Sequence, residues 1–135
     1  MKKLKLYLET SVWNFYFADD APEKRDVTIK FFEQIAEDHY EIFISDIVLE
    51  EIAKASEEHQ RRLFNLMQTH RPTELEITDE ALSLADQYRA EGVVPQKAVE
   101  DAIHAAVATC YAMDALISWN LKHLANFRRM KMING

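Results

Sequence analysis

Residues 4–11 read Leu4-Lys5-Leu6-Tyr7-Leu8-Glu9-Thr10-Ser11, and this stretch decides the fold class that the sequence predicts. Its leucines alternate with other residues, which is typical of a short buried β-strand. An acid, Glu9, follows the strand directly, and we expect a short helix to begin near Ser11. In α/β proteins, functional side chains gather outside the carboxyl ends of such strands, so Glu9 is a candidate site residue.

The rest of the chain repeats this alternation of short strands and helices. Apolar residues at helical spacing predict the helices, and short apolar runs between them predict the strands. Further strands are expected at 41–44, 75–77 and 114–118, and helices at 22–38, 47–55, 57–70, 78–92 and 96–112. Strands that alternate with helices indicate an α/β domain with a mostly parallel sheet.

Several local signals predict where helices begin and end and which face they bury. Asp19 or Asp20 is expected to cap the helix that starts near Pro22, and Gly92 is a stop signal for the helix that starts at Thr78. The buried face of the helix at 22–38 is expected to carry apolar residues at helical spacing, namely Val27, Phe31, Phe32 and Ile35.

The length and composition fit one globular domain. The 135 residues are 48% apolar and 29% charged, and only two glycines and three prolines argue against a turn-rich all-β protein. The single cysteine, Cys110, has no internal disulfide partner, so a reducing cytoplasm is the expected setting. We expect no signal peptide and no membrane span, because no apolar run is long enough for either.

The net charge of −7 disfavours indiscriminate binding to nucleic acid, which depends on clustered lysine and arginine. It does not exclude a nuclease, because an acidic metal site carries part of that charge. Basic residues gather in two groups, for which solvated surface is the ordinary explanation. These groups are Lys122, Arg128, Arg129 and Lys131 near the C-terminus, and Arg61, Arg62 and Arg71 in the middle of the chain.

Four segments each deliver one oxygen side chain that can bind a metal. Glu9 and Asn120 lie just past predicted strands. Glu51 falls on the apolar arc of its helix, whereas Glu50 falls on the polar side. Asp101 lies within an alanine-rich helix that is apolar almost all round after residue 101. Because buried carboxylates are costly unless something pairs them, a divalent cation is their natural partner, and the sequence predicts a cation site.

Three of these four residues also have a simpler explanation, and Asp101 is the hardest of the four to explain in that way. Glu9 would be an exposed acid in a turn, Glu51 would lie at the edge of the apolar face with its tip in water, and Asn120 would cap the helix after it. Glu100 and His104 are one helical turn apart and would pair on the surface. His104 is the weaker candidate for a metal ligand, because no second histidine stands at helical spacing.

Neighbouring residues add further alternatives. Thr10 and Ser11 either cap a helix or hold a metal-bound water or a phosphate. Trp13 and Trp119 can stack on a nucleic-acid base, although large apolar residues more often belong to the core. The sequence has no glycine-rich phosphate loop, no Gly-x-Ser-x-Gly elbow and no Cys-x-x-Cys pair, which removes several other chemistries.

These motifs, in this order, resemble the PIN-domain family, which includes the toxins of VapBC-type toxin–antitoxin pairs. Family members begin with a strand, an acid and Thr or Ser, and carry a second acid in the helix after the second strand. An Asp before an alanine-rich run and a last strand before Thr/Ser-x-Asp complete the pattern. The matching segments are Tyr7-Leu8-Glu9-Thr10-Ser11, residues 44–51, residues 101–108 and Ser118-Trp119-Asn120.

The resemblance covers nearly the whole chain and implies a single three-layer α/β/α domain over residues 1–135, with four to five short strands. It implies a Mg²⁺- or Mn²⁺-dependent endoribonuclease, with Glu9, Glu51 and Asp101 as metal ligands. Asn120 would be an outer ligand or hold a water, and Ser118 would support its loop. Family toxins are usually dimers that a small antitoxin holds inactive. Contacts to the RNA substrate are expected from Lys122, Arg128, Arg129 and Trp13.

This sequence departs from the family pattern at two ligand positions. The first acid is usually Asp but here is Glu9, one methylene longer, and the last is often Asp but here is Asn120. Each change removes or displaces a negative oxygen, and Mg²⁺ is strict about geometry. Relatives often continue past the position of Gly135, so a final strand or a partner-binding tail is expected to be missing.

Three functions therefore stay open at this point. The first is a ribonuclease toxin with an antitoxin. The second is a PIN-like module that binds RNA or a protein without cutting, which the substitutions at Glu9 and Asn120 favour. The third is a metal-dependent nuclease that acts in RNA processing or on DNA, without an antitoxin.

Overall fold

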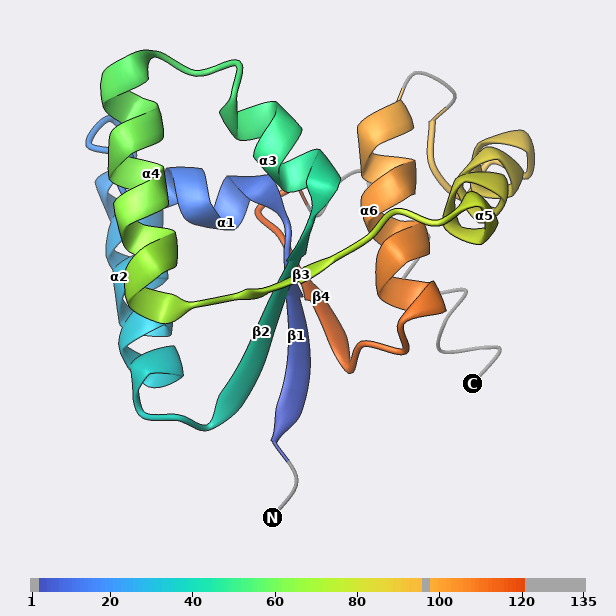
Figure 1. The fold of residues 1–135 in the computed structure, drawn as a ribbon. Helices are drawn as coiled ribbons and strands as arrows, with labels where there is room; N and C mark the ends of the chain where they lie inside the picture. The colour runs from blue at the N-terminus through green and yellow to red at the C-terminus, as the bar shows by residue number, and fades with distance from the viewer. Residues whose placement is uncertain (1–2, 96–97, 121–135) are drawn as a thin grey trace.

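The computed structural model describes residues 3–95 and 98–120, and short strands alternate with helices along the chain (Figure 1). The strands are β1 (Leu4–Leu8), β2 (Tyr40–Ser45), β3 (Thr73–Leu75) and β4 (Ala115–Ile117). The helices are α1 (Thr10–Phe15), α2 (Pro22–Ala36), α3 (Asp46–Ile52), α4 (Glu57–His70), α5 (Asp79–Ala90) and α6 (Val99–Cys110).

The described strands form one sheet in the order β3-β2-β1-β4, and every neighbouring pair is parallel. Figure 1 shows α1, α2 and α4 on one side of this sheet and α5 and α6 on the other. The predicted three-layer α/β/α architecture is therefore confirmed. A parallel sheet requires this arrangement, because each strand is connected to the next through a helix that packs on a face of the sheet.

The central strands are buried on both faces. Leu6 and Leu8 of β1, and Ile42 and Ile44 of β2, are at most 5% exposed. Tyr7 points to the opposite face of β1 and is fully buried as well. The core is therefore continuous through the sheet, and a polar atom such as the Tyr7 hydroxyl needs a partner inside the protein.

Helix α2 buries most of the face that the sequence predicts, and Phe31 packs partly buried against the core. Phe32 and Ile35 are buried as expected, but Val27 is 56% exposed and Thr28 is buried in its place. Thr28 can be buried because its hydroxyl is satisfied: it accepts a hydrogen bond of 3.0 Å from the indole N–H of Trp119. The buried face of α2 is therefore shifted toward this polar contact relative to the expected face, and the spacing of apolar residues does not reveal the shift.

The start of α2 also differs from the prediction. Ala21, and neither Asp19 nor Asp20, occupies the N-cap, and its side chain makes no capping hydrogen bond. The Asp19 carboxylate instead accepts from the Arg25 guanidinium at 2.9 Å. Pro22 at the first helical position partly replaces the cap, because proline has no N–H to satisfy and its φ already suits a helix.

Helix α5 begins and ends where the sequence predicts. The Thr78 hydroxyl accepts from the backbone N–H of Ala81 at 3.1 Å, and Gly92 adopts a φ of +73° just after the helix. Strand β3 lies two residues earlier than the expected 75–77, and α3 ends at Ile52 rather than near residue 55. Helix α6 begins at Val99, and the predicted start at 96–97 falls outside the described residues. Within the described part of the chain, no helix is long and apolar enough to span a membrane.

The order of the strands creates a switch point between β1 and β4. After β1, the chain builds β2 and β3 on one side and then returns to add β4 on the other side of β1. Leu8 pairs with Ile117, and the backbone N–H of Glu9 donates to the Ile117 carbonyl at 3.1 Å. The residues that follow these two strands are therefore neighbours, at the position where open α/β sheets bind ligands.

Candidate metal centre

A cavity of about 390 Å³ opens at this switch point, outside the carboxyl ends of β1 and β4. Its walls come from α1, α3 and α6 and from the residues that follow β1, α3 and β4, so residues far apart in the sequence meet there. The cavity is lined by Glu9, Thr10, Ser11, Asn14, Phe15, Glu51, Lys54, Glu100 and Asn120. Glu9, Glu51 and Asn120 were predicted from the sequence to share a site, and the fold brings all three to this cavity.

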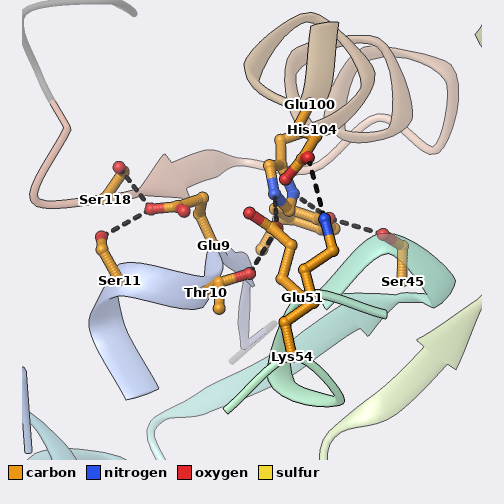
Figure 2. Close-up of polar contacts among 10 residues, drawn as sticks. Glu9, Thr10, Ser11, Ser45, Glu51, Lys54, Glu100, His104 and Ser118 are labelled. Atoms are coloured by element: carbon orange, nitrogen blue, oxygen red, sulfur yellow. Dashed lines mark hydrogen bonds and ion pairs between the residues drawn. The ribbon is translucent and has the colours of Figure 1, made fainter. Parts of the chain in front are cut away.

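Glu9 is an almost fully buried acid that hydroxyl groups hold in place. Its side chain is 2% exposed, and its Oε1 accepts from Ser11 Oγ at 2.5 Å and from Ser118 Oγ at 2.7 Å. The same serine oxygens accept backbone N–H groups, Ser11 from Trp119 at 2.9 Å and Ser118 from Asn120 at 2.8 Å. Glu9 is therefore not an exposed turn acid, and its serines tie the segment after β4 to α1 (Figure 2).

Glu51 projects from α3 toward the same cavity, whereas its neighbour Glu50 is exposed, as the helical wheel predicts. Its side chain is 22% exposed, and its Oε1 accepts from Thr10 Oγ1 and from His104 Nε2, both at 2.7 Å. Burial alone would raise the pKa of Glu51, but hydrogen bonds with His104, Glu100 and Thr10 outweigh it and lower this pKa to about 2. Glu51 is therefore a fixed anion.

Glu100 is a third acid at this cavity, and the sequence analysis did not select it. The adjacent Glu51 carboxylate, together with partial burial, raises the pKa of Glu100. Its Oε1 is 3.5 Å from the ammonium of Lys54, whose side chain is 72% exposed (Figure 2). Glu51 and Glu100 each disfavour the ionisation of the other, and one lysine lies beside them. A further positive charge in the cavity would therefore be favourable.

His104 stands where the sequence analysis did not expect it. It is fully buried, and its partners are Glu51 and the Tyr7 hydroxyl, so the predicted surface pair with Glu100 is wrong. The physical reason is its position on α6, where buried alanines surround it on the face that packs against the sheet. A lone imidazole among small apolar residues was the available signal, because such a group needs a partner inside the protein.

Asp101 lies in the first turn of α6 and is half-buried, one residue beyond Glu100. It is not among the residues that line the cavity, unlike Glu9, Glu51 and Asn120. The alanines at positions 105 and 108 that follow it are buried, as the sequence predicts. The structure therefore gathers three of the four predicted oxygen donors around one cavity and leaves Asp101 beside it.

Of the residues expected to contact RNA, the structure describes only Trp13. Trp13 is 0% exposed and packs on Phe32 with ring centroids 5.1 Å apart, so the expectation that it stacks on a base is wrong. Trp119 is half-buried against Phe15, with the ammonium of Lys24 within 5.6 Å of both rings. The expected basic contacts Lys122, Arg128 and Arg129 lie outside the described residues.

The donor set fits a hard divalent cation. One ligand atom each from Glu9, Glu51 and His104 lies within 4.8 Å of the others. Each of the two carboxylates is held by two donors through its Oε1, so neither pair of donors uses the second oxygen. Mg²⁺ and Mn²⁺ prefer such oxygens, and an acidic cavity of this size has room for the waters that Mg²⁺ retains.

Comparisons with known proteins agree with this fold and arrangement. The VapBC2 structure from Rickettsia felis, bound to a DNA fragment from their promoter, is similar in fold, with a TM-score of 0.66 and 20% sequence identity. The similarity covers 93% of this chain and 92% of that one. None of the curated proteins matches the chain. The PIN domain family profile matches residues 6–124, most of the sequence, and the chain therefore belongs to the PIN domain family.

Proposed function

We propose that the chain is a Mg²⁺- or Mn²⁺-dependent endoribonuclease whose cation is held by Glu9, Glu51 and Asp101. One observation carries this proposal: two anchored carboxylates from different elements, Glu9 and Glu51, face one cavity at the switch point of the sheet. Membership of the PIN domain family supports it, because PIN domains are generally nucleases.

The proposed division of labour follows from the positions of the side chains. When bound, the cation supplies Lewis-acid stabilisation of charge on the phosphate and lowers the pKa of the attacking water. Thr10 and Ser11 fix the two carboxylates, and the Asn120 amide, which lines the cavity, orients the water. Lys54, exposed at the cavity wall, neutralises a phosphate oxygen of the RNA.

The third carboxylate comes from the first turn of α6, where two acids are adjacent. The family pattern assigns Asp101, the acid before the alanine-rich run. Glu100 lines the cavity and is paired with Lys54, so we assign it the role of setting the local charge and placing that lysine. Replacing each acid separately distinguishes these roles.

We further propose that this nuclease is the toxin of a toxin–antitoxin pair, that it acts in the cytoplasm as a homodimer, and that a small antitoxin covers its site. The likeness in fold to VapBC2 supports the antitoxin partner. A small reading frame upstream of the gene, whose product copurifies with this chain and blocks its activity, would be the expected partner. Activity that no neighbouring gene product inhibits would favour an RNA-processing nuclease instead.

The test is cleavage of a pool of structured RNAs by purified protein with Mn²⁺ or Mg²⁺, and with EDTA. We expect metal-dependent cutting that is lost in Asp101→Ala and in Glu51→Gln. In the matched variant Glu100→Ala we expect reduced cutting, and in Glu50→Gln, which alters an exposed acid next to Glu51, unchanged cutting. A folded wild type that cuts no RNA with either metal would overturn the nuclease and favour a PIN-like binding module.

A further inference from the structure

A chain of hydrogen bonds runs from the cavity into the core of the protein. Glu51 Oε1, His104 Nε2 and Nδ1, the Tyr7 hydroxyl and the Ser45 hydroxyl are joined by three contacts, each 2.7 Å long. The four residues come from α3, α6, β1 and β2, and all except Glu51 are fully buried.

The donors along this chain can be counted. An ionised Glu51 only accepts, so His104 Nε2 carries a hydrogen and donates to it. In the neutral imidazole Nδ1 then accepts from the Tyr7 hydroxyl, which in turn accepts from Ser45. A tyrosine hydroxyl is ordinarily protonated near neutral pH, as this order requires. With the His104 imidazole neutral, every donor along these contacts points toward Glu51.

The position of Ser45 indicates that this chain is more than incidental packing. Ser45 is the N-cap residue of α3, a place where a serine hydroxyl normally accepts from a backbone N–H of the first turn. Here its side chain makes no capping hydrogen bond and binds the Tyr7 hydroxyl instead. The N-terminus of α3 therefore lacks its usual side-chain cap, and Ser45 instead completes the series of hydrogen bonds that ends at Glu51.

We infer that Tyr7 and His104 form a positioning relay that holds Glu51 in the orientation needed to bind the cation, and that His104 is not itself a metal ligand. Both ring nitrogens of His104 already have hydrogen-bond partners, and Nε2 shares Oε1 of Glu51 with the Thr10 hydroxyl. Because these two donors hold Oε1, the other carboxylate oxygen of Glu51 is directed toward the cavity. Partners that orient a metal-binding side chain in this way typically affect metal affinity by about 10- to 100-fold.

The inference rests on the proposed metal site, and it is tested by the affinity for Mn²⁺ alone, measured from the electron paramagnetic resonance signal of free Mn²⁺. Relative to wild type, we expect about 10- to 100-fold weaker binding in His104→Leu. Tyr7→Phe should weaken binding by a smaller factor, because the Tyr7 hydroxyl is linked to Glu51 only through His104. His104→Gln can place an N–H close to the position of Nε2 and should recover most of the affinity.

Two controls separate positioning from folding and from direct ligation. Tyr111→Phe also removes a hydrogen-bonded tyrosine hydroxyl, one that donates to the Glu76 carbonyl at 2.8 Å, and should bind Mn²⁺ as the wild type does. Pulsed electron paramagnetic resonance of bound Mn²⁺ tests for direct ligation by His104, because a nitrogen ligand couples to the metal. We expect the wild type and His104→Gln to show the same nitrogen coupling. If His104→Leu does not fold, Tyr7→Phe and His104→Gln carry the comparison.

The possible failures are distinguishable. A wild type that binds no Mn²⁺ would overturn the proposed metal site and the relay with it. A wild type that binds Mn²⁺, with Tyr7→Phe and the His104 variants equal to it, would overturn the relay alone. Nitrogen coupling that is lost in His104→Gln would make His104 a ligand and contradict the inference.

Discussion

Glu9 and Glu51 each accept hydrogen bonds from two donors through a single oxygen. Ser11 and Ser118 hold Glu9, and Thr10 and His104 hold Glu51. Anchoring of this kind fixes a carboxylate before any ligand arrives, so less conformational entropy is lost on binding. It also explains why hydroxyl residues follow the first acid, a pattern that the sequence displays and the structure puts to use.

The charge of Glu100 should destabilise the metal-free protein slightly, because it lies close to the charge of Glu51. We expect Glu100→Gln to raise the melting temperature in EDTA slightly, by a change in unfolding free energy of about 0.5 kcal/mol or less. The same variant should gain less from Mn²⁺. Glu58→Gln is the matched control, because it removes an acid from an exposed ion pair with Arg62. A lower melting temperature for Glu100→Gln in EDTA would contradict this expectation.

The lowered pKa of Glu51 predicts a loss of stability in acid. This pKa is about 2 in the folded protein and ordinarily 4.5, so the unfolded chain takes up the proton first as pH falls. The stability contributed above pH 4.5 is therefore lost progressively as the pH falls to about 2. The raised pKa of Glu100 acts in the opposite sense, but its side chain is 42% exposed and solvent screens it.

Urea unfolding between pH 4.5 and pH 2 tests this prediction. The unfolding free energy of Glu51→Gln should fall less steeply than that of the wild type. Glu50→Gln, which changes the exposed neighbour on the same helix, should follow the wild-type curve. Parallel curves for wild type and Glu51→Gln would show that Glu51 has an ordinary pKa.

At the scale of single elements, α6 ends in a Schellman motif without glycine. Ala112 N–H donates to the Thr109 carbonyl at 3.1 Å and Met113 N–H to the Ala108 carbonyl at 3.0 Å, while Ala112 adopts a φ of +55°. A left-handed conformation strains any residue that has a Cβ, and glycine removes the strain. The turn matters for function because it leads directly into β4, which carries Ser118 to Glu9.

Replacing Ala112 by glycine should therefore stabilise the protein, by up to about 1 kcal/mol of unfolding free energy. Ala53→Gly is the matched control: Ala53 is also exposed, but its φ is −62°, so the substitution should destabilise by about 0.5–1 kcal/mol. Denaturant unfolding of both variants decides the matter. A destabilised Ala112→Gly would mean that the turn is not strained in solution.

The elements that the sequence predicts well are those with strong local signals. Helix α4 has the predicted bounds, and α5 has both a capping threonine and a terminal glycine. The turns at Asp38, Arg71 and Ala112 were not predictable, because all three adopt positive φ without being glycine. The exposed Val27 and the buried His104 were also missed, since each depends on tertiary hydrogen bonds that periodicity does not contain.

At the scale of the whole molecule, the strand order gathers the site. Glu9 follows β1 and Ser118 follows β4, and these strands are adjacent although more than 100 residues separate the two side chains in sequence. A sequence reading could predict that acids collect at the carboxyl ends of parallel strands. The sequence pattern selected Asp101, whereas Glu100 is the acid of α6 that lines the cavity; which of the two does so depends on how α6 is rotated against the sheet.

The overall charge also bears on function. A net charge of −7 disfavours a general attraction for RNA, so in the proposed nuclease a bound cation and Lys54 would supply the local positive charge at the cavity. If the proposed cation binds among these acids, it offsets their mutual repulsion, and its binding should then stabilise the whole fold.

The thermal shift caused by Mn²⁺ tests the central claim most directly. At a concentration of 100 times Kd, binding to the folded state adds about 2.7 kcal/mol of stability, which corresponds to a rise of several degrees in Tm for a domain of this size. We predict this rise for the wild type and for Glu41→Gln, an exposed acid on β2, and its loss in Glu9→Gln and Glu51→Gln. An unchanged Tm of the wild type at saturating Mn²⁺, or an equal rise in Glu51→Gln, would contradict the metal centre.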